Sequence, residues 1–77
     1  MKVHVDLFVN LKKYAPSDDS SFEMEIEHGA KIKAVLEVLK IPVEEKVIIL
    51  INGRNADESD PLKEEDTITL FSPLSGG

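Results

Sequence analysis

Hydrophobic and polar residues alternate in two segments near the start of the chain, and each segment predicts a β-strand with one buried face. The residues expected to face the core are Val3, Val5, Leu7 and Val9 in the first segment, KVHVDLFVNL, and Phe22, Met24 and Ile26 in the second, SFEMEIEH. Glutamates fill the alternate positions of the second segment. Because a row of like charges opposes further strand pairing, we expect the second strand to lie antiparallel to the first at an edge of the sheet.

The pattern changes to a helical period after Gly29. The apolar residues that recur at helical spacing are Ile32, Val35, Leu36 and Leu39. This spacing places them on one stripe of a helix. Pro42 cannot continue the helix, because proline lacks the backbone N–H and its ring clashes with the preceding turn. The segment GAKIKAVLEVLKIP therefore predicts one amphipathic helix.

Two further segments predict strands in the second half of the chain. KVIILING has β-branched residues on both faces, which is typical of an interior strand. Its Asn52 and Gly53 both tolerate a positive φ and indicate a tight turn. A polar segment that contains Pro61 follows, and TITLF is the last strand, with Ile68 and Leu70 directed inward.

The order of these elements is strand, strand, helix, strand, strand. One amphipathic helix covers only one face of a sheet, and the one-sided alternation of the strands leaves the other face in contact with water. An α+β fold of the β-grasp, or ubiquitin-like, type satisfies both facts, with a mixed four- to five-stranded sheet packed on one main helix; the periodicity alone also allows other α+β sheets. We expect this domain over residues 1–72 and a flexible tail over residues 73–77. The predicted core consists of Val5, Leu7, Ile26, Val35, Leu36, Leu39, Ile68 and Leu70.

Phe8 and Phe71 fall on the face of the predicted sheet that points away from the helix. In a β-grasp sheet the first and last strands lie side by side in the centre, so the two rings form one apolar patch. Monomeric proteins rarely leave such a patch exposed without a use, and we therefore expect it to bind a partner. One of Val47, Ile49 and Ile51 should join it. The alternative is a shifted register that buries one of the two rings.

The composition of the chain limits which partners and which cellular compartment we expect. The chain has 77 residues, which suffices for one small domain. Its net charge of −6 argues against a nucleic-acid partner, since phosphate contacts need clustered Lys and Arg. The longest apolar run, VIILI, is too short to span a membrane, and the first residues do not form a signal peptide. With no cysteine, the chain has no disulfide or thiolate metal site and fits the cytoplasm.

No group of residues in the sequence predicts catalysis or metal binding by the domain itself. His4 and His28 have no second ligand at useful spacing, so we interpret both as surface residues and expect no metal site. The adjacent carboxylates are Asp18 with Asp19 and Glu44 with Glu45. Neighbouring side chains on a strand point apart, which does not suit paired acid–base catalysis.

The chain ends FSPLSGG, with Gly76 and Gly77 as its last residues. This end, within DPLKEEDTITLFSPLSGG, and the segments VDLFVNLKKYA and ILINGR together resemble the sulfur-carrier family that includes the small subunit of molybdopterin synthase and the thiamine sulfur carrier. The sequence departs from the family at two places. Glu65 stands where the family's turn usually has glycine, and Ser72 precedes a single proline, Pro73, where many members have two.

The resemblance implies covalent chemistry at the tail and not catalysis by the domain. An E1-like adenylating enzyme would join the carboxylate of Gly77 to AMP, using ATP and magnesium that the enzyme holds, so this chain would bind no cofactor itself. A persulfide sulfur donor would then displace AMP, and the resulting thiocarboxylate would pass its sulfur to an acceptor synthase subunit. Gly76 and Gly77 lack Cβ atoms and therefore fit a narrow channel. We expect Pro73, Leu74 and Ser75 to contact the partner there.

The resemblance leaves several functions open. The long first connection, LKKYAPSDDSS, favours the molybdopterin pathway over thiamine-type carriers, whose connection is shorter. The alternatives are a thiamine or tRNA-thiolation carrier, a protein modifier joined to lysines as small archaeal modifiers are, and a ubiquitin-like interaction module with an inert tail. In an arbitrary protein a terminal diglycine has no function more often than it has one. Here the matching element order and the context of the diglycine favour a carrier.

Overall fold

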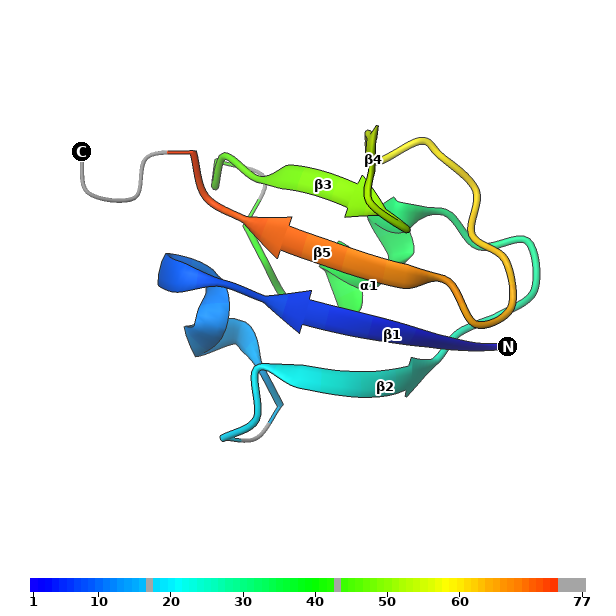
Figure 1. Ribbon diagram of the computed structural model, residues 1–77, viewed down its shortest axis with the longest axis horizontal. Helices are drawn as coiled ribbons and strands as arrows, with labels where there is room; N and C mark the ends of the chain where they lie inside the picture. Colours follow the sequence, from blue (N-terminus) through cyan, green and yellow to red (C-terminus); the bar gives the residue numbers. More distant parts are fainter. Residues whose placement is uncertain (17, 43, 74–77) are drawn as a thin grey trace.

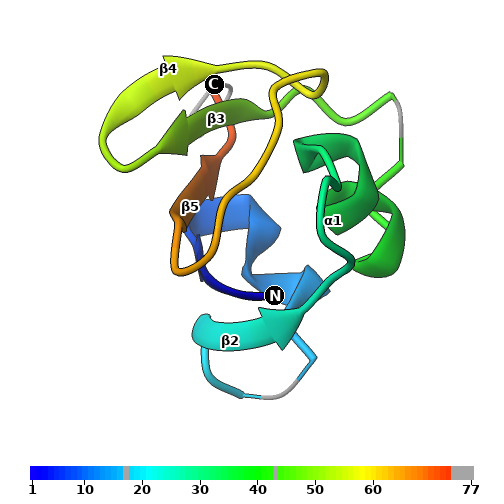
Figure 2. The same cartoon turned by 90° about the vertical axis from the view of Figure 1, so that its right-hand side faces the viewer.

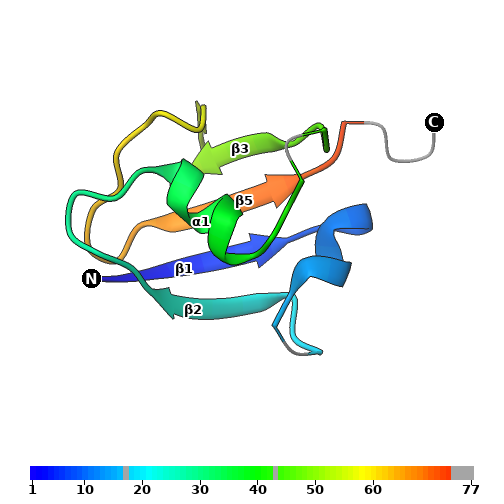
Figure 3. The ribbon, with the colours of Figure 1, turned by 180° about the vertical axis from the view of Figure 1, so that it is seen from behind.

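The computed structural model describes residues 1–16, 18–42 and 44–73. Within them, five strands form one mixed sheet in the order β2-β1-β5-β3-β4, and one α-helix lies across one face of it (Figures 1 and 3). The strands are β1 (Lys2–Leu7), β2 (Ser21–Glu25), β3 (Ile48–Ile51), β4 (Arg54–Ala56) and β5 (Thr67–Phe71), and the helix is α1 (Ile32–Val38). The predicted β-grasp fold is confirmed, and the sheet curves around the helix (Figure 2).

The two central strands, β1 and β5, run parallel to each other. Their register pairs Val5 with Ile68 and Leu7 with Leu70, and all four side chains are fully buried. Because strand residues alternate between the two faces, these pairs determine which residues face α1 and which face away from it. β2 pairs with β1 in the antiparallel direction and forms one edge of the sheet, as predicted.

The first strand is shorter than the sequence predicts. β1 ends at Leu7, and a 3-10 helix, η1 (Val9–Tyr14), follows, so the prediction that Val9 continues the strand is wrong. A longer strand would have no partner, because the pairing of β1 with β2 and with β5 stops at or before Leu7. The backbone N–H of Leu11 instead donates to the carbonyl of Phe8 (3.1 Å), and the side chain of Leu11 is fully buried.

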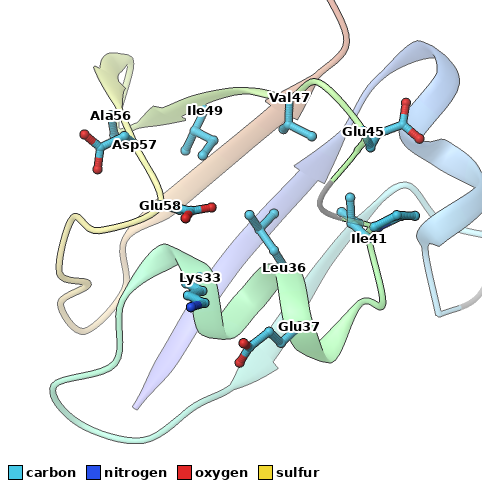
Figure 4. A pocket seen from close by; sticks show the side chains of 11 residues that line it. Lys33, Leu36, Glu37, Ile41, Glu45, Val47, Ile49, Ala56, Asp57 and Glu58 are labelled. Atoms are coloured by element: carbon cyan, nitrogen blue, oxygen red, sulfur yellow. The ribbon is translucent and has the colours of Figure 1, made fainter.

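The core lies between α1 and the inner face of the sheet. Its buried hydrophobic residues are Val3, Val5, Leu7, Leu11, Ile32, Val35, Leu39, Ile41, Ile49, Leu62, Ile68 and Leu70. Two of the predicted core residues, Ile26 and Leu36, are only partly buried and pack against this core from its margins. For Leu36 the reason is its place on the side of the helical stripe that faces β3, where the sheet leaves a hollow (Figure 4).

The segment that follows β4 holds the start of α1. The N–H groups of Ile32 and Lys33 donate to the carbonyls of Asp60 (3.0 Å) and Glu58 (2.9 Å). These bonds satisfy donors that the first turn of a helix otherwise leaves without a partner. In the described part of the chain, no helix is long and apolar enough to cross a membrane.

The turn at Asn52 and Gly53 joins β3 to β4, and both residues have positive φ, 53° and 84°, as predicted. The sequence does not predict β4, because its three residues are polar or small. Nδ2 of Asn52 donates to Oδ1 of the buried Asp66 (2.9 Å), and Oδ1 of Asn52 accepts from the N–H of Thr67 (3.0 Å). The side chain of Asn52 thus ties the hairpin to the start of β5.

A cluster of charged residues lies on the outer face near the start of β1. Nε2 of His4 lies 2.7 Å from Oε1 of Glu65, and Nδ1 of the same ring lies 3.5 Å from Oε2 of Glu23. The hydrogen bond with His4 lowers the pKa of Glu65 below its ordinary value, with a smaller contribution from the charge of Lys2. Glu65 has a φ of 69°. Glycine adopts this left-handed conformation without steric cost, so it is the residue that this backbone position favours.

Leu36 and Leu70 test the difference between the margin and the centre of the core. Leu70→Ala should lower the free energy of unfolding by about 2–5 kcal/mol, because the side chain of Leu70 is fully buried. Leu36→Ala should lower it by about 1–2 kcal/mol, since Leu36 keeps part of its contact with water. Urea denaturation followed by circular dichroism measures both values. Equal losses for the two variants would contradict the marginal position of Leu36.

The carboxylate of Glu65 should make stability depend on pH in the acid range. Because its pKa is lower in the folded chain, Glu65 contributes stability that is fully present above the ordinary pKa of 4.5 and is lost as the pH falls through the folded value. Glu65→Gln removes this titration. The difference in Tm between the wild type and this variant should therefore be larger at pH about 5.5 than at pH about 3. Thermal melts over this range measure it, and a constant difference would show that the contact with His4 does not stabilise the fold.

Candidate functional site

The candidate site is on the outer face of the sheet, which points away from α1. Because β1 and β5 are parallel neighbours, both finish at the same end of the sheet (Figure 1). Since Leu7 pairs with Leu70 and both are buried, the residues that follow them, Phe8 and Phe71, take neighbouring positions directed to the opposite face. The N–H of Phe8 donates to the carbonyl of Leu70 (3.0 Å), and the backbone of Phe8 is still extended, with φ −120° and ψ 152°.

β3 contributes further apolar side chains to this face. Ile48 pairs with Phe71, and Leu50 pairs with Thr69. Phe8 is 46% exposed, and Ile48, Leu50 and Phe71 are partly buried, so neither ring is enclosed as a shifted register would require. None of the four belongs to the residues that pack against the core. We refer to Phe8, Ile48, Leu50 and Phe71 as the outer apolar patch.

The sequence places the aromatic pair here but assigns the wrong face of β3 to it. Of the three residues expected to join the patch, Ile49 is buried in the core, and Val47 and Ile51 pack against that core. The cause is the register, which pairs Ile49 with the inward-facing Leu70. A strand that is apolar on both faces has no alternation that identifies its inner face. Only its pairing with β5 determines that Ile48, which the sequence analysis missed, lies on the outer face.

Charge is unevenly distributed over the outer face. The end at which β1 begins carries Lys2, His4 and Glu23, and the outer apolar patch lies at the other end. Between the two ends, Asp6 pairs with Thr69, and both are partly buried. A protein that covers the patch would therefore meet an apolar centre with a polar border, the arrangement typical of protein–protein interfaces.

The chain leaves the sheet beside the outer apolar patch. β5 ends at Phe71, the side chain of Ser72 is buried, and Pro73 is exposed. The tail predicted over residues 73–77 is described only at this proline. Its other predicted site residues, which lie outside the described residues, are Leu74, Ser75, Gly76 and Gly77. The structure thus brings the start of the tail and the aromatic pair to one end of the sheet.

Other titratable side chains have local partners or face solvent. His4 lies between two surface carboxylates, and His28 is exposed in the turn after β2. Within residues 1–16, 18–42 and 44–73, no group of three or more His, Cys, Asp or Glu side chains is arranged to hold a metal ion. The hydroxyl of Tyr14 donates to Oε1 of Glu45 (2.9 Å), and burial together with this bond raises the pKa of Tyr14.

Solved structures of other small proteins share this fold. SAMP1 from Haloferax volcanii has a TM-score of 0.79 and 20% sequence identity, and the match covers 100% of both chains. SAMP1 from Methanosarcina acetivorans, a small archaeal modifier protein, has a TM-score of 0.69 and 27% identity over 99% of this chain and 96% of that one. A chain in the complex of subunits 1 and 2 of molybdopterin-converting factor from Helicobacter pylori has a TM-score of 0.61 and 27% identity over 100% of both chains.

Sequence comparison identifies the family. No curated protein matches the chain. The model of the ThiS family matches residues 5–77, which include the second half of β1, all of β5, every residue of the outer apolar patch and the final Gly-Gly. The chain therefore belongs to the ThiS family, and with it to the ubiquitin-like sulfur carriers that its sequence resembles.

Proposed function

We propose that this chain carries sulfur on its C-terminal residue, as a thiocarboxylate formed from the carboxylate of Gly77, and that it is a carrier and not an enzyme. The observation that carries the proposal is the family match, which continues through the diglycine at residues 76 and 77. The arrangement at the end of β5 supports it, because the tail starts where the outer apolar patch offers a docking surface.

The chemistry requires activation of the carboxylate, which is a poor electrophile because its charge is delocalised over both oxygens. An oxygen of the Gly77 carboxylate attacks the α-phosphorus of ATP, held with magnesium by an adenylating enzyme, and pyrophosphate leaves. The terminal sulfur of a persulfide then attacks the carbonyl carbon of the acyl-adenylate, AMP leaves, and an acyl disulfide remains. A second thiol of the sulfur donor then attacks the donor's own sulfur in the S–S bond. A disulfide forms within the donor, and the thiocarboxylate remains on Gly77.

The length of the tail connects docking to chemistry. Gly77 follows Phe71 by six residues, and a chain of that length reaches at most roughly 20 Å. A partner that covers Phe71 can therefore hold its reacting group within reach of Gly77. Because Gly76 and Gly77 have no Cβ, they can lie in a channel narrow enough to exclude water from the acyl-adenylate. In this proposal Leu74 and Ser75 contact the entrance of that channel, next to Pro73.

We assign the sulfur to molybdopterin biosynthesis, with a synthase subunit as its acceptor. The support is the likeness to a chain of the Helicobacter pylori complex, in which subunits 1 and 2 of molybdopterin-converting factor are bound to each other. The long connection between β1 and β2, which contains η1, agrees with this branch. A thiamine or tRNA-thiolation carrier would use the same activation and would differ in the acceptor.

A second candidate function is that of a protein modifier, and the likeness to SAMP1 from two archaea favours it. Both functions begin with adenylation and differ in the nucleophile that displaces AMP, which is sulfur in a carrier and a lysine amine in a modifier. Mass spectrometry of the protein purified from its host separates them. Replacement of one oxygen by sulfur marks a carrier, a branched lysine peptide marks a modifier, and an unmodified tail marks an interaction module.

If the outer apolar patch is the docking surface, a substitution within it should weaken partner binding. Phe71→Ser should weaken binding to the adenylating enzyme or the synthase subunit by about 2 kcal/mol or more, which is typical of an aromatic residue at the centre of an interface. The fold should survive, because Phe71 does not pack against the core. Titration calorimetry measures the affinity. Val38→Ser is the control, since Val38 is 59% exposed and lies on α1, on the other side of the sheet. Equal binding by both variants would contradict the role of the patch.

The tail predicts a strict dependence on the position of the last carboxylate. Deletion of Gly77 leaves the carboxylate one residue short of the AMP site, and one alanine added after Gly77 moves it past that site. Gly76→Val places a branched Cβ in the channel. Each change should abolish ATP–pyrophosphate exchange with the adenylating enzyme. Tm should change little, because the described core consists of residues before Ser72.

The added alanine gives the sharpest result of the three. It keeps every side chain of the wild-type chain, so a loss of exchange reports the position of the last carboxylate. If this variant is adenylated and sulfurated at the wild-type rate, the carboxylate of Gly77 is not the required reactive group, and the proposed function is wrong.

A further inference from the structure

A concave surface lies on the helix side of the sheet, opposite the outer apolar patch. It runs between α1, β3 and the segment around β4, and its volume is about 380 Å³ (Figure 4). We call it the helix-side groove. Its lining residues are Lys33, Leu36, Glu37, Ile41, Pro42, Glu45, Val47, Ile49, Ala56, Asp57 and Glu58. The volume is in the range of roughly 300–1,000 Å³ that ligand pockets have.

The floor of the helix-side groove is apolar, and the end of α1 builds part of it. The N–H of Ile41 donates to the carbonyl of Leu36 (3.0 Å), and the N–H of Lys40 donates to the carbonyl of Glu37 (3.1 Å). With a φ of 61° at Lys40, these bonds form a Schellman ending, which turns the chain back so that Ile41 and Leu36 line the same surface.

β3 and β4 complete this floor. Val47 and Ala56 are partly buried and pack against the core, as Leu36 does, and all three line the groove. Beneath them, Ile49 is buried and pairs with Ala56. The floor is therefore a fixed part of the fold and not the end of a flexible loop.

The rim of the helix-side groove is acidic. Glu37 stands on the helix, Glu58 reaches over the opening from the segment after β4, and Glu45 stands at the end nearest η1 (Figure 4). Glu37 and Glu58 are exposed, and no ion pair between described residues uses either carboxylate. Lys33 is the one cationic residue that lines the groove in the described part of the chain. An apolar floor with carboxylates around it attracts a ligand that is apolar on one side and cationic on the other.

We propose that the helix-side groove binds a short basic amphipathic segment of a partner protein, whose aliphatic side chains lie on Leu36, Val47 and Ala56 and whose Lys or Arg side chains pair with Glu37 and Glu58. The rim charge repels nucleic acids and anionic membranes. Because the groove and the outer apolar patch lie on opposite sides of the sheet, one partner can hold the groove while another covers the patch. The proposal does not depend on sulfur transfer.

The test is a titration of the full chain, labelled with ¹⁵N, with the synthetic peptide KKLLKKLLKK. Backbone amide shifts should change saturably at Leu36, Ile41 and Ala56 and should remain unchanged at Phe71. The peptide KKSSKKSSKK keeps every charge and removes the aliphatic side chains. Its affinity should be at least about tenfold lower, since that loss is expected when the apolar contacts are removed.

Charge-reversal variants separate the groove from the general attraction of an acidic chain for a basic peptide. Glu37→Lys with Glu58→Lys should raise the Kd for KKLLKKLLKK at least about tenfold, because two attractive pairs become repulsive. The matched control is Glu25→Lys with Glu27→Lys, which changes the net charge equally at exposed positions by the opposite edge of the sheet and should change the Kd by less than about twofold.

Four outcomes would overturn the proposal. These are equal weakening by the two double variants, equal affinity for the two peptides, shift changes centred on Phe71, and no saturable change at millimolar peptide. Melting curves of each variant, measured first, show that the comparison is between folded proteins.

Discussion

Parallel pairing of β1 with β5 joins the two ends of the chain, and the other features of the fold follow from it. In a parallel pair the chain must cross from the end of one strand to the start of the other, and here that crossover contains the remaining strands and α1. α1 packs on one face of the sheet and encloses the fully buried pairs Val5–Ile68 and Leu7–Leu70. The same register directs Phe8 and Phe71 to the opposite face. It also makes both strands end at the same end of the sheet, so the polypeptide that leaves β5 starts beside Phe8.

A domain with one main helix leaves much of its sheet in contact with water, and this structure uses both sides differently. On the outer face, Ile48 and Leu50 extend the aromatic pair into an apolar surface without acidic side chains in its centre. On the inner side, α1 is too short to cover β3 and β4 completely, and a groove with an acidic rim remains. The chain as a whole is acidic, with a net charge of −6. The different charge of the two surfaces therefore comes from where the acidic side chains lie on each. An apolar partner surface fits the first, and a cationic one fits the second.

The sequence predicts those parts of the fold in which one face of an element is apolar and the other polar. β1, β2, β5 and the stripe of α1 meet this condition, and the structure confirms their type, order and inner faces. β3 does not, because Ile48 and Ile49 are equally apolar, and its inner face depends on pairing with a strand distant in the chain. The end of β1 likewise depends on where its neighbours stop, and β4 has too few residues for a pattern. The same alternation predicts the outward position of Phe8 and Phe71 and does not predict that of Ile48 and Leu50. The site residues predicted in the tail after Pro73 lie outside the described residues.

The small size of the domain explains why the proposed chemistry takes place at the end of the chain. A chain of 77 residues has little interior beyond the core that keeps it folded, so it cannot also enclose a reacting group away from water. When the reactive carboxylate is on a short tail, the channel of a partner can exclude water from it. The domain then needs only a docking surface within the tail's reach. A carrier must also leave its first partner before it reaches the second. A small patch in which one ring, Phe8, is 46% exposed before docking is consistent with a limited interface that forms and dissociates readily. In the proposed function, the separation of a stable core from a docking surface and a reactive end would let one short chain serve an adenylating enzyme and a sulfur acceptor in turn.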